Sequence, residues 1–287
     1  MKQHTTLFIS VLCALSFIAT SCQPTPPDGP QTSDAPFYLT VSMPTTNMTD
    51  VSITSGAESN TNGRTLNWLN GDQITINGII SRPVKFMGVA TLRALFEFDD
   101  VPTAPYHLLH PASSYIDATR MAFPATQLNN EGAPVAALFD EVTDVVETYH
   151  LAAMLRLPLR RSAASDADTH KIAYIEFRGN NSEQVSGIFE IDYAVPSISG
   201  CDTSAEAQSI VVKLDSALST DQATDIFIAI PAIDYSKGFS LRIVDENNHY
   251  MDIAIERAQL VNVGRVYTLS ECEFVPTGTL IGVDIPQ

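Results

Sequence analysis

The sequence lacks the short motifs by which most enzymes hold a nucleophile, a phosphate or a dinucleotide. Its 287 residues contain no G-x-S-x-G elbow, no phosphate-binding loop and no dinucleotide fingerprint. Carboxylates are adjacent in Asp99-Asp100 and Asp140-Glu141, but neighbours in the chain do not face one another. We therefore expect no enzyme, no catalytic residue and no cofactor, because an active site would have to be assembled from scattered residues.

Metal-binding patterns are also scarce. His107 and His110 have the spacing H-x-x-H, which suits a metal site on a helix. In a strand, a separation of three residues points the two side chains to opposite faces. Asp50, Asp72 and Asp117 do not have calcium-loop spacing. The sequence therefore predicts ordinary strand histidines and no metal site.

Basic side chains are few, with 16 Lys and Arg against 33 Asp and Glu and a net charge of −17. This balance disfavours nucleic acid as a partner and favours solubility in a crowded envelope. Cysteines are few as well, and only Cys201 and Cys272 lie outside the N-terminal region. In an oxidising compartment they would close a loop of about 70 residues, worth about 4 kcal/mol. Two separate buried thiols are an equally good interpretation.

Long apolar runs are absent, since residues 7–19 are too few for a bilayer span of about 20 residues. Lys2, this apolar run and a small-residue junction instead make a secretory signal. The junction Thr20-Ser21-Cys22 resembles the lipobox of bacterial lipoproteins. The resemblance implies that residues 1–22 are a signal peptide, that cleavage falls between Ser21 and Cys22, and that Cys22 carries a diacylglycerol. The alternative is an ordinary signal peptide that happens to contain a cysteine.

A proline-rich stretch follows the lipobox. Residues 23–36 (QPTPPDGPQTSDAP) contain five prolines and no large apolar residue. Such a segment stays extended at about 3.1 Å per residue, so it reaches roughly 40 Å. We expect a tether that holds a folded body away from the membrane of a Gram-negative cell envelope.

Period-two alternation dominates the rest of the chain and indicates antiparallel sheets. It predicts strands at residues 37–43, 73–77, 82–86, 92–98, 106–110, 121–123, 150–159, 171–177, 187–193, 209–214, 225–230, 239–244, 250–255 and 265–269. Residues 226–230 are apolar on both faces and are expected in the centre of a sheet. About fourteen short strands favour an all-β chain with two β-sandwiches, at residues 37–145 and 146–287, although residues 160–170 are a second candidate boundary.

Several segments resemble the fimbrillin-like (Mfa-like) family. Residues 64–76 (RTLNWLNGDQITI) resemble its W-x-x-G-D-x-I signature, and residues 106–113 (YHLLHPAS) and 123–127 (FPATQ) resemble later segments. Residues 225–235 (DIFIAIPAIDY) and 265–269 (RVYTL) resemble its C-terminal block. The resemblance implies two tandem transthyretin-like antiparallel β-sandwich domains and a shaft, tip or anchor subunit of surface fimbriae, or a related adhesin. Implied partners are other fimbrial subunits by β-strand addition, the outer membrane through the lipid, and a host or bacterial surface ligand.

The family resemblance also implies processing by a trypsin-like protease after Arg64, which would release the strand at residues 37–43. Arg64 lies in a polar stretch that we expect to be exposed; a surface arginine that is never cut is the alternative. Residues 273–287 would serve as a donor strand or would pack on their own domain. Two prolines limit how many of these residues can form backbone hydrogen bonds with a neighbouring strand. Two other functions are weaker: a glycan-binding outer-membrane lipoprotein accessory to an importer, and an envelope hydrolase.

Overall fold

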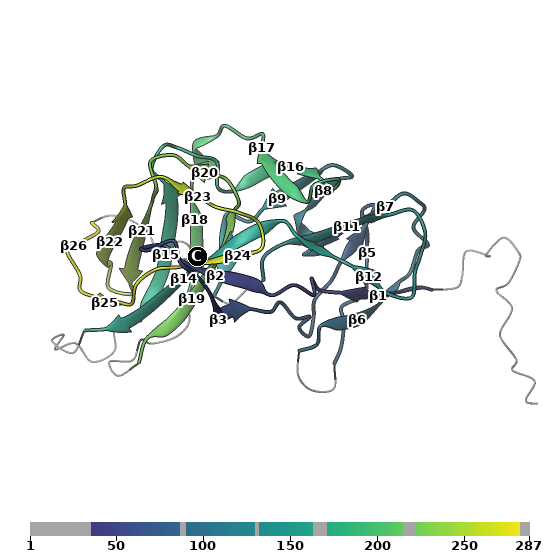
Figure 1. Ribbon diagram of the computed structural model, residues 1–287, viewed down its shortest axis with the longest axis horizontal. Coiled ribbons are helices and arrows are strands. Elements are labelled where there is room, and N and C mark those ends of the chain that lie inside the picture. The colour runs from purple at the N-terminus through teal and green to yellow at the C-terminus, as the bar shows by residue number, and fades with distance from the viewer. Residues whose placement is uncertain are drawn as a thin grey trace, which may run out of the picture. The chain divides into compact units, whose positions relative to one another are not determined.

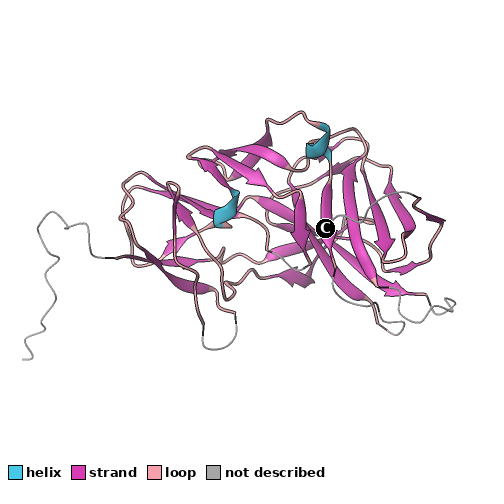
Figure 2. Cartoon of the chain, turned by 180° about the vertical axis from the view of Figure 1, so that it is seen from behind, coloured by secondary structure: helices cyan, strands magenta, loops and turns pink. Residues whose placement is uncertain are grey.

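The computed structural model describes residues 36–86, 90–129, 132–162, 171–214, 218 and 222–281, all within one compact unit, Ser33–Gln287. Strands form nearly all of its regular structure, together with two short 3-10 helices, η1 (Ala112–Ser114) and η2 (Ala205–Gln208) (Figure 2). No helix in these ranges is long and apolar enough to cross a bilayer. The predicted all-β class is confirmed, and the transthyretin-like tandem arrangement stays a prediction.

Two sheets come mainly from the first half of the chain (Figure 1). One has three strands in the order β12-β1-β6, and the other has five in the order β13-β11-β7-β4-β5. Their strands are β1 (Phe37–Ser42), β4 (Thr75–Ile76), β5 (Ile79–Ile80), β6 (Arg93–Phe98), β7 (Tyr106–His110), β11 (Val135–Phe139), β12 (Val146–Glu147) and β13 (Tyr149–His150).

Two larger sheets contain most of the second half. Their strand orders are β19-β14-β24-β2-β3, with β25 also on β14, and β10-β18-β15-β21-β22-β26. Their strands are β2 (Met48–Ser52), β3 (Glu58–Arg64), β10 (Thr126–Leu128), β14 (Ala152–Arg161), β15 (Ile172–Gly179), β18 (Ile210–Lys213), β19 (Thr224–Pro231), β21 (Phe239–Asp245), β22 (His249–Ile255), β24 (Arg265–Thr268), β25 (Cys272–Phe274) and β26 (Gly278–Thr279).

Two small sheets complete the fold, in the orders β17-β16-β9-β8 and β20-β23. Their strands are β8 (Tyr115–Asp117), β9 (Arg120–Phe123), β16 (Gly187–Asp192), β17 (Ser197–Gly200), β20 (Asp234–Tyr235) and β23 (Gln259–Leu260). In β16 the alternation seen in the sequence is realised, because Phe189 and Ile191 are buried while Glu190 and Asp192 are exposed.

Hydrogen-bonded sheets join the two halves of the chain. β2 pairs in parallel with β24, β10 pairs in parallel with β18, and β9 pairs with β16. The buried apolar side chains of both halves form one continuous core cluster. Strands from both sides of residue 145 therefore lie in the same sheets, and the division into domains at residues 37–145 and 146–287 stays a prediction.

The strand at Ile226–Ile230 does not lie where its composition predicts. β19 is buried along most of its length, yet among the described residues it is an edge strand whose one neighbour in the sheet is β14. The central placement expected for this segment is therefore wrong. Side chains from β10, described below, cover its open edge and explain its burial.

Candidate functional site

β1 is the first strand of the described fold and the middle strand of its sheet. It runs antiparallel to β6, with Leu39 opposite Phe96 and Val41 opposite Ala94, and parallel to β12. Leu39 and Val41 are at most 1% exposed, whereas Tyr38 on the other face is 50% exposed. β1 thus completes a backbone ladder on both sides and contributes to the core, although it comes from near the start of the fold.

Trp68 connects this strand to the body of the protein. Its side chain is fully buried, and its indole N–H donates a hydrogen bond to the carbonyl of Val41 at 3.0 Å. The ring packs edge-on against Phe96 and His110, with centroid distances of 4.8 and 4.9 Å. The tryptophan of the W-x-x-G-D-x-I segment therefore fills the core beside β1 and also binds its backbone.

The other residues of that segment form the turn after Trp68. Gly71 has a φ of +92°, a conformation that glycine adopts without a steric cost. The Asp72 carboxylate accepts a hydrogen bond from the backbone N–H of Leu69 at 2.7 Å, and Ile74 is fully buried. Trp68, Gly71, Asp72 and Ile74 thus each have a local structural role.

Gln127, from the F-P-A-T-Q segment, seals the edge of β19. Its backbone pairs with β18, and its buried side-chain amide pairs with Ala229 in both directions. The amide Nε2 donates to the Ala229 carbonyl and Oε1 accepts from the Ala229 N–H, each at 2.9 Å. The amide group imitates a neighbouring strand, so β10 satisfies an edge that would otherwise be open.

Arg64, the predicted processing site, ends β3 and lies opposite Met48 of β2. Its guanidinium lies 4.2 Å from the centroid of the Phe227 ring. Burial disfavours the charged form and lowers the pKa of Arg64 below its ordinary value. The expectation of an exposed polar stretch is corrected at this residue, because the segment forms the outer strand of a sheet and the arginine side chain is half-buried.

A cavity of about 370 Å³ lies beside this arginine. Its walls include Met43 and Arg64 together with Asp72, His110 and Gln127. His110 is buried with Nδ1 3.1 Å from the Gln73 carbonyl, and burial lowers the pKa of its imidazole. The cavity is therefore bounded both by the segment that ends at Arg64 and by the body that follows it.

His110 and His107 do not share a site. The His107 ring instead contacts the Tyr193 ring edge-on, with a centroid distance of 5.1 Å. Within the part of the chain that the structure describes, no three His, Cys, Asp or Glu side chains gather as metal ligands would. The histidines thus behave as packed strand residues.

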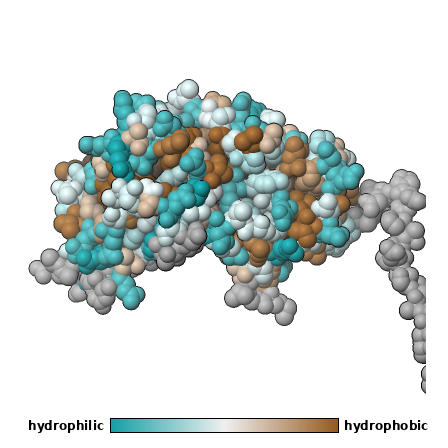
Figure 3. Space-filling model, in the orientation of Figure 1, coloured by the Kyte–Doolittle hydropathy of each residue, from teal (hydrophilic) through white to brown (hydrophobic). Residues whose placement is uncertain are grey.

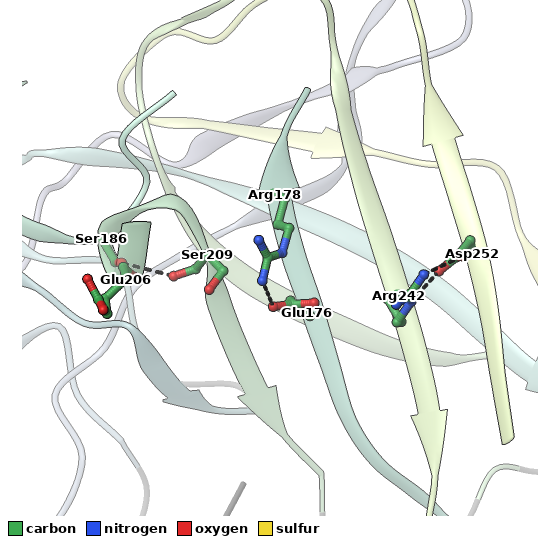
Figure 4. Close-up of polar contacts among 7 residues, drawn as sticks. All are labelled: Glu176, Arg178, Ser186, Glu206, Ser209, Arg242 and Asp252. Carbon is green, nitrogen blue, oxygen red and sulfur yellow. Dashed lines mark hydrogen bonds and ion pairs between the residues drawn. The ribbon is translucent and has the colours of Figure 1, made fainter. Parts of the chain in front are cut away.

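The outer surface carries paired charges rather than a reactive cluster. Glu176, Arg242 and Asp252 lie opposite one another on β15, β21 and β22, and Arg242 binds Asp252 through two hydrogen bonds of 2.8 and 2.9 Å (Figure 4). Arg178 donates to Glu176 at 2.6 Å. On the face seen in Figure 3, apolar side chains are interspersed among hydrophilic ones. Each arginine is thus paired with a carboxylate on the outer face of this sheet.

Cys201 and Cys272 are both free thiols. Cys201 is exposed after β17, while Cys272 begins β25, and burial raises the pKa of the Cys272 thiol to about 11. The structure contains two separate thiols, but the expectation that such thiols would both be buried is not met, because Cys201 is exposed. Cys22 and Ser21 lie outside the described residues.

The C-terminal segment packs on its own fold as far as it is described. β25 pairs with β14 and β26 pairs with β22. The N–H of Leu280 donates to the carbonyl of Asn248 at 2.8 Å, and Ile281 is 92% exposed. Residues 282–287, which complete the predicted donor strand, lie outside the described residues.

No protein-family model and no curated protein sequence matches this chain. Solved structures do resemble it. They include a candidate cell adhesion protein from Bacteroides fragilis (TM-score 0.48, 12% identity, 85% of this chain and 96% of that chain). Another from Bacteroides ovatus has a TM-score of 0.43 at 10% identity, over 83% of this chain and 93% of that chain.

A third similar structure is the tip fimbrial protein Mfa3 of Porphyromonas gingivalis, with a C-terminal truncation. It has a TM-score of 0.35 at 10% identity and covers 85% of this chain and 97% of that chain. The structural neighbours of this chain are thus cell adhesion and fimbrial proteins, the class that its motifs resemble. At these scores and identities the likeness by itself assigns no function.

Proposed function

We propose that this chain is a lipoprotein, tethered through Cys22 to the outer membrane, that acts as a structural or adhesive subunit of surface fimbriae and assembles by strand exchange. The observation that carries the proposal is the place of β1. This strand comes first in the described fold, so it leaves without threading, and it has a partner strand on each side.

Removal of β1 would leave β6 and β12 with unpaired backbone edges. It would also uncover the buried side chains opposite it, Phe96 and Phe98 among them. Such edges are templates for another strand, and an incoming strand would regain two ladders together with an apolar groove. A second strand in the place of β1 is therefore more favourable than an empty groove between β6 and β12.

The position of Arg64 is consistent with release of this segment. A cut after Arg64 separates β1, β2 and β3 from the rest of the chain. β3 is the outer strand of its sheet and β2 is next to it, so both can detach from the edge of the sheet. Their loss leaves β24, the partner of β2, as the new edge strand. Because Arg64 is half-buried over Phe227, cleavage first requires β3 to lift from the sheet.

The incoming strand is assigned to the C-terminal segment of a second copy. Ile281, Val283 and Ile285 alternate with Gly282 and Asp284 in the sequence. This is the period-two pattern that one buried face requires. Residues 278–280 are engaged with β22 in their own fold, so the donor begins after them.

The test uses the purified precursor and a trypsin-like protease. We expect one cut, after Arg64, followed by oligomers that resist SDS. Arg64→Gln should prevent both, whereas Arg82→Gln, which removes an exposed arginine paired with Glu97 and Asp99, should prevent neither. In native membranes, mass spectrometry of the form not yet cut at Arg64 should find acyl chains on Cys22, whereas the cut form should begin at Thr65.

Two results would contradict the proposal. If the protein is cut but forms no oligomers, strand exchange is excluded, and the protein is instead a tip subunit, an anchor subunit or a non-polymeric adhesin. Oligosaccharide binding by the uncut monomer, without any assembly after cutting, would favour the glycan-binding alternative instead.

A further inference from the structure

Two consecutive carbonyls of β1 are held by donors that come after Arg64 in the chain. The Val41 carbonyl accepts from Trp68 Nε1 at 3.0 Å. The Ser42 carbonyl accepts from the backbone N–H of Thr148 at 3.1 Å and from its Oγ1 at 2.9 Å. Trp68 and Thr148 are 0% and 3% exposed, so these donors have little access to water.

We propose that Trp68 and Thr148 form a carbonyl clamp that holds whichever strand occupies the place of β1 by its backbone alone. The clamp lets this site accept strands of unrelated sequence: first the chain's own residues 37–42, then a segment of a second copy. The inference rests on the proposed strand exchange and identifies how the site binds its partner.

The physical reason is that the clamp contains only donors, and every residue of any strand has a carbonyl to offer. Proline is no exception, because it lacks the N–H and keeps the carbonyl. When the site is empty, both donors lose their protein acceptors and face the uncovered groove, and an incoming strand restores hydrogen bonds that are buried from water. The clamp therefore favours rapid filling and makes no demand on the side chains of the incoming strand.

The burial of each position along β1 then determines which residue of the incoming strand can occupy it. Phe37, Leu39 and Val41 face the core, Thr40 is half-buried, and Ser42 is fully buried. We place Ile281, Val283 and Ile285 of the second copy at those three core positions. Asp284 then takes the half-buried place of Thr40.

A shift of the incoming strand by two residues would instead put Asp284 in the place of Ser42. That place is 0% exposed, and a buried, unpaired carboxylate is strongly disfavoured. In the favoured alignment Pro286 takes the place of Ser42, where Thr148 requires only a carbonyl. Pro286 lacks the N–H that Ser42 has in its parallel pairing with Glu147 of β12, so at this place the donor keeps the carbonyl contact of the clamp alone.

The experiment measures release of two labelled peptides from protein that has been cut after Arg64. One peptide has the sequence of residues 36–44, and the other has that of residues 279–287. Trp68→Phe keeps an aromatic ring and removes the indole N–H, while Thr148→Val keeps the shape and removes the hydroxyl. We expect each variant to release both peptides about fivefold to tenfold faster, and by the same factor for the two sequences. Thr148→Ser, which keeps the hydroxyl, should release them as the wild type does.

Matched controls come from buried hydrogen bonds away from β1. Tyr235 donates through its hydroxyl to the Pro231 carbonyl, and Thr75 donates to the Ile79 carbonyl. Tyr235→Phe and Thr75→Val should leave both release rates unchanged. An effect of the clamp variants on one peptide alone, or on neither, would overturn the proposal.

Failure of strand exchange itself is a separate outcome. If wild-type protein takes up neither peptide, the proposed function fails, and the clamp is judged on the uncut chain. There, Thr148→Val should speed hydrogen exchange of the amides in residues 37–43, while Thr75→Val should not. Unchanged exchange in those amides would overturn the clamp too. If Trp68→Phe does not fold, Thr148→Val and its serine control decide the result.

Discussion

Strand edges are covered in two different ways in this fold. The gap between β6 and β12 is filled by β1, a strand from the start of the fold. The open edge of β19 is filled by the Gln127 side chain, whose backbone is fixed in another sheet by β18. Both edges are satisfied, but only β1 can leave along the chain after a single cut.

Under the proposed strand exchange, this difference distinguishes a replaceable strand from a protected edge. Exposed strand edges invite pairing with other chains, and a side-chain amide blocks such pairing without providing a removable strand. The Gln127 amide keeps the edge of β19 closed, whereas the cut that frees β1 also removes β2 and β3 and makes β24 a new edge strand. The predictions that follow test this contrast, starting with the largest expected effect.

Leu39→Ala should destabilise the protein by about 3 kcal/mol, because it removes a fully buried side chain and leaves a cavity. It should also speed loss of β1 after cutting at Arg64. Ile228→Ala in β19, equally buried, is the matched control and should lower stability to a similar extent without affecting β1. Urea unfolding measures the loss of stability, and peptide release measures the rate at which β1 is lost. If both variants lose β1 equally fast, β1 and β19 do not differ in the way proposed.

Gln127→Leu should cost about 2 kcal/mol, since the N–H and carbonyl of Ala229 lose their partners inside the protein. The exposed edge of β19 should then associate with other chains, and sedimentation of the uncut variant should show concentration-dependent oligomers. Gln127→Glu is the companion variant, because it keeps one acceptor for the Ala229 N–H. If the Gln127→Leu variant stays monomeric and as stable as the wild type, the Gln127 amide is not needed to protect the edge of β19.

Phe227→Leu should lower stability by about 1 kcal/mol, through loss of the cation–π contact with Arg64 and some packing. Its sharper effect should be on cleavage, because Arg64 would be held less firmly and β3 would lift more often. A time course with limiting protease should show a cut after Arg64 several times faster than in the wild type. An unchanged rate would mean that this contact does not limit access.

Lowering the pH should weaken the fold through His110 and His150. Burial lowers the pKa of both imidazoles below the ordinary value of 6.5. The unfolded chain therefore takes up protons before the folded one, so stability falls as the pH drops below about 6.5. Thermal unfolding between pH 7.5 and 5 should show this loss, and His110→Phe should reduce its slope; an identical slope would exclude His110 as a contributor.

Local pattern predicted most of the elements. Alternation in residues 187–193 correctly indicates a strand with one buried face, and the apolar positions of residues 37–43 correctly indicate β1. The polar residues 58–64 carry no such signal, and they form β3 because β2 lies beside them. Residues 82–86 alternate in sequence yet form no strand.

The candidate site was partly visible in the sequence. Trp68, Arg64 and Gln127 fall in segments that resemble a known family, and they surround one cavity or contact its walls. Thr148 gave no signal, because a threonine that binds one backbone carbonyl 106 residues away has no sequence pattern. The edge position of β19 was hidden for the same reason, since its cover comes from Gln127, 102 residues earlier.

The amino-acid sequence alone determined that this is a strand-rich chain, because periodicity and composition act over a few neighbouring residues. Only the tertiary structure decided which strands lie at edges, that sheets cross residue 145, and that Trp68 and Thr148 meet on β1. Those facts depend on contacts between distant residues, and a one-dimensional pattern does not record which strand is hydrogen-bonded to which.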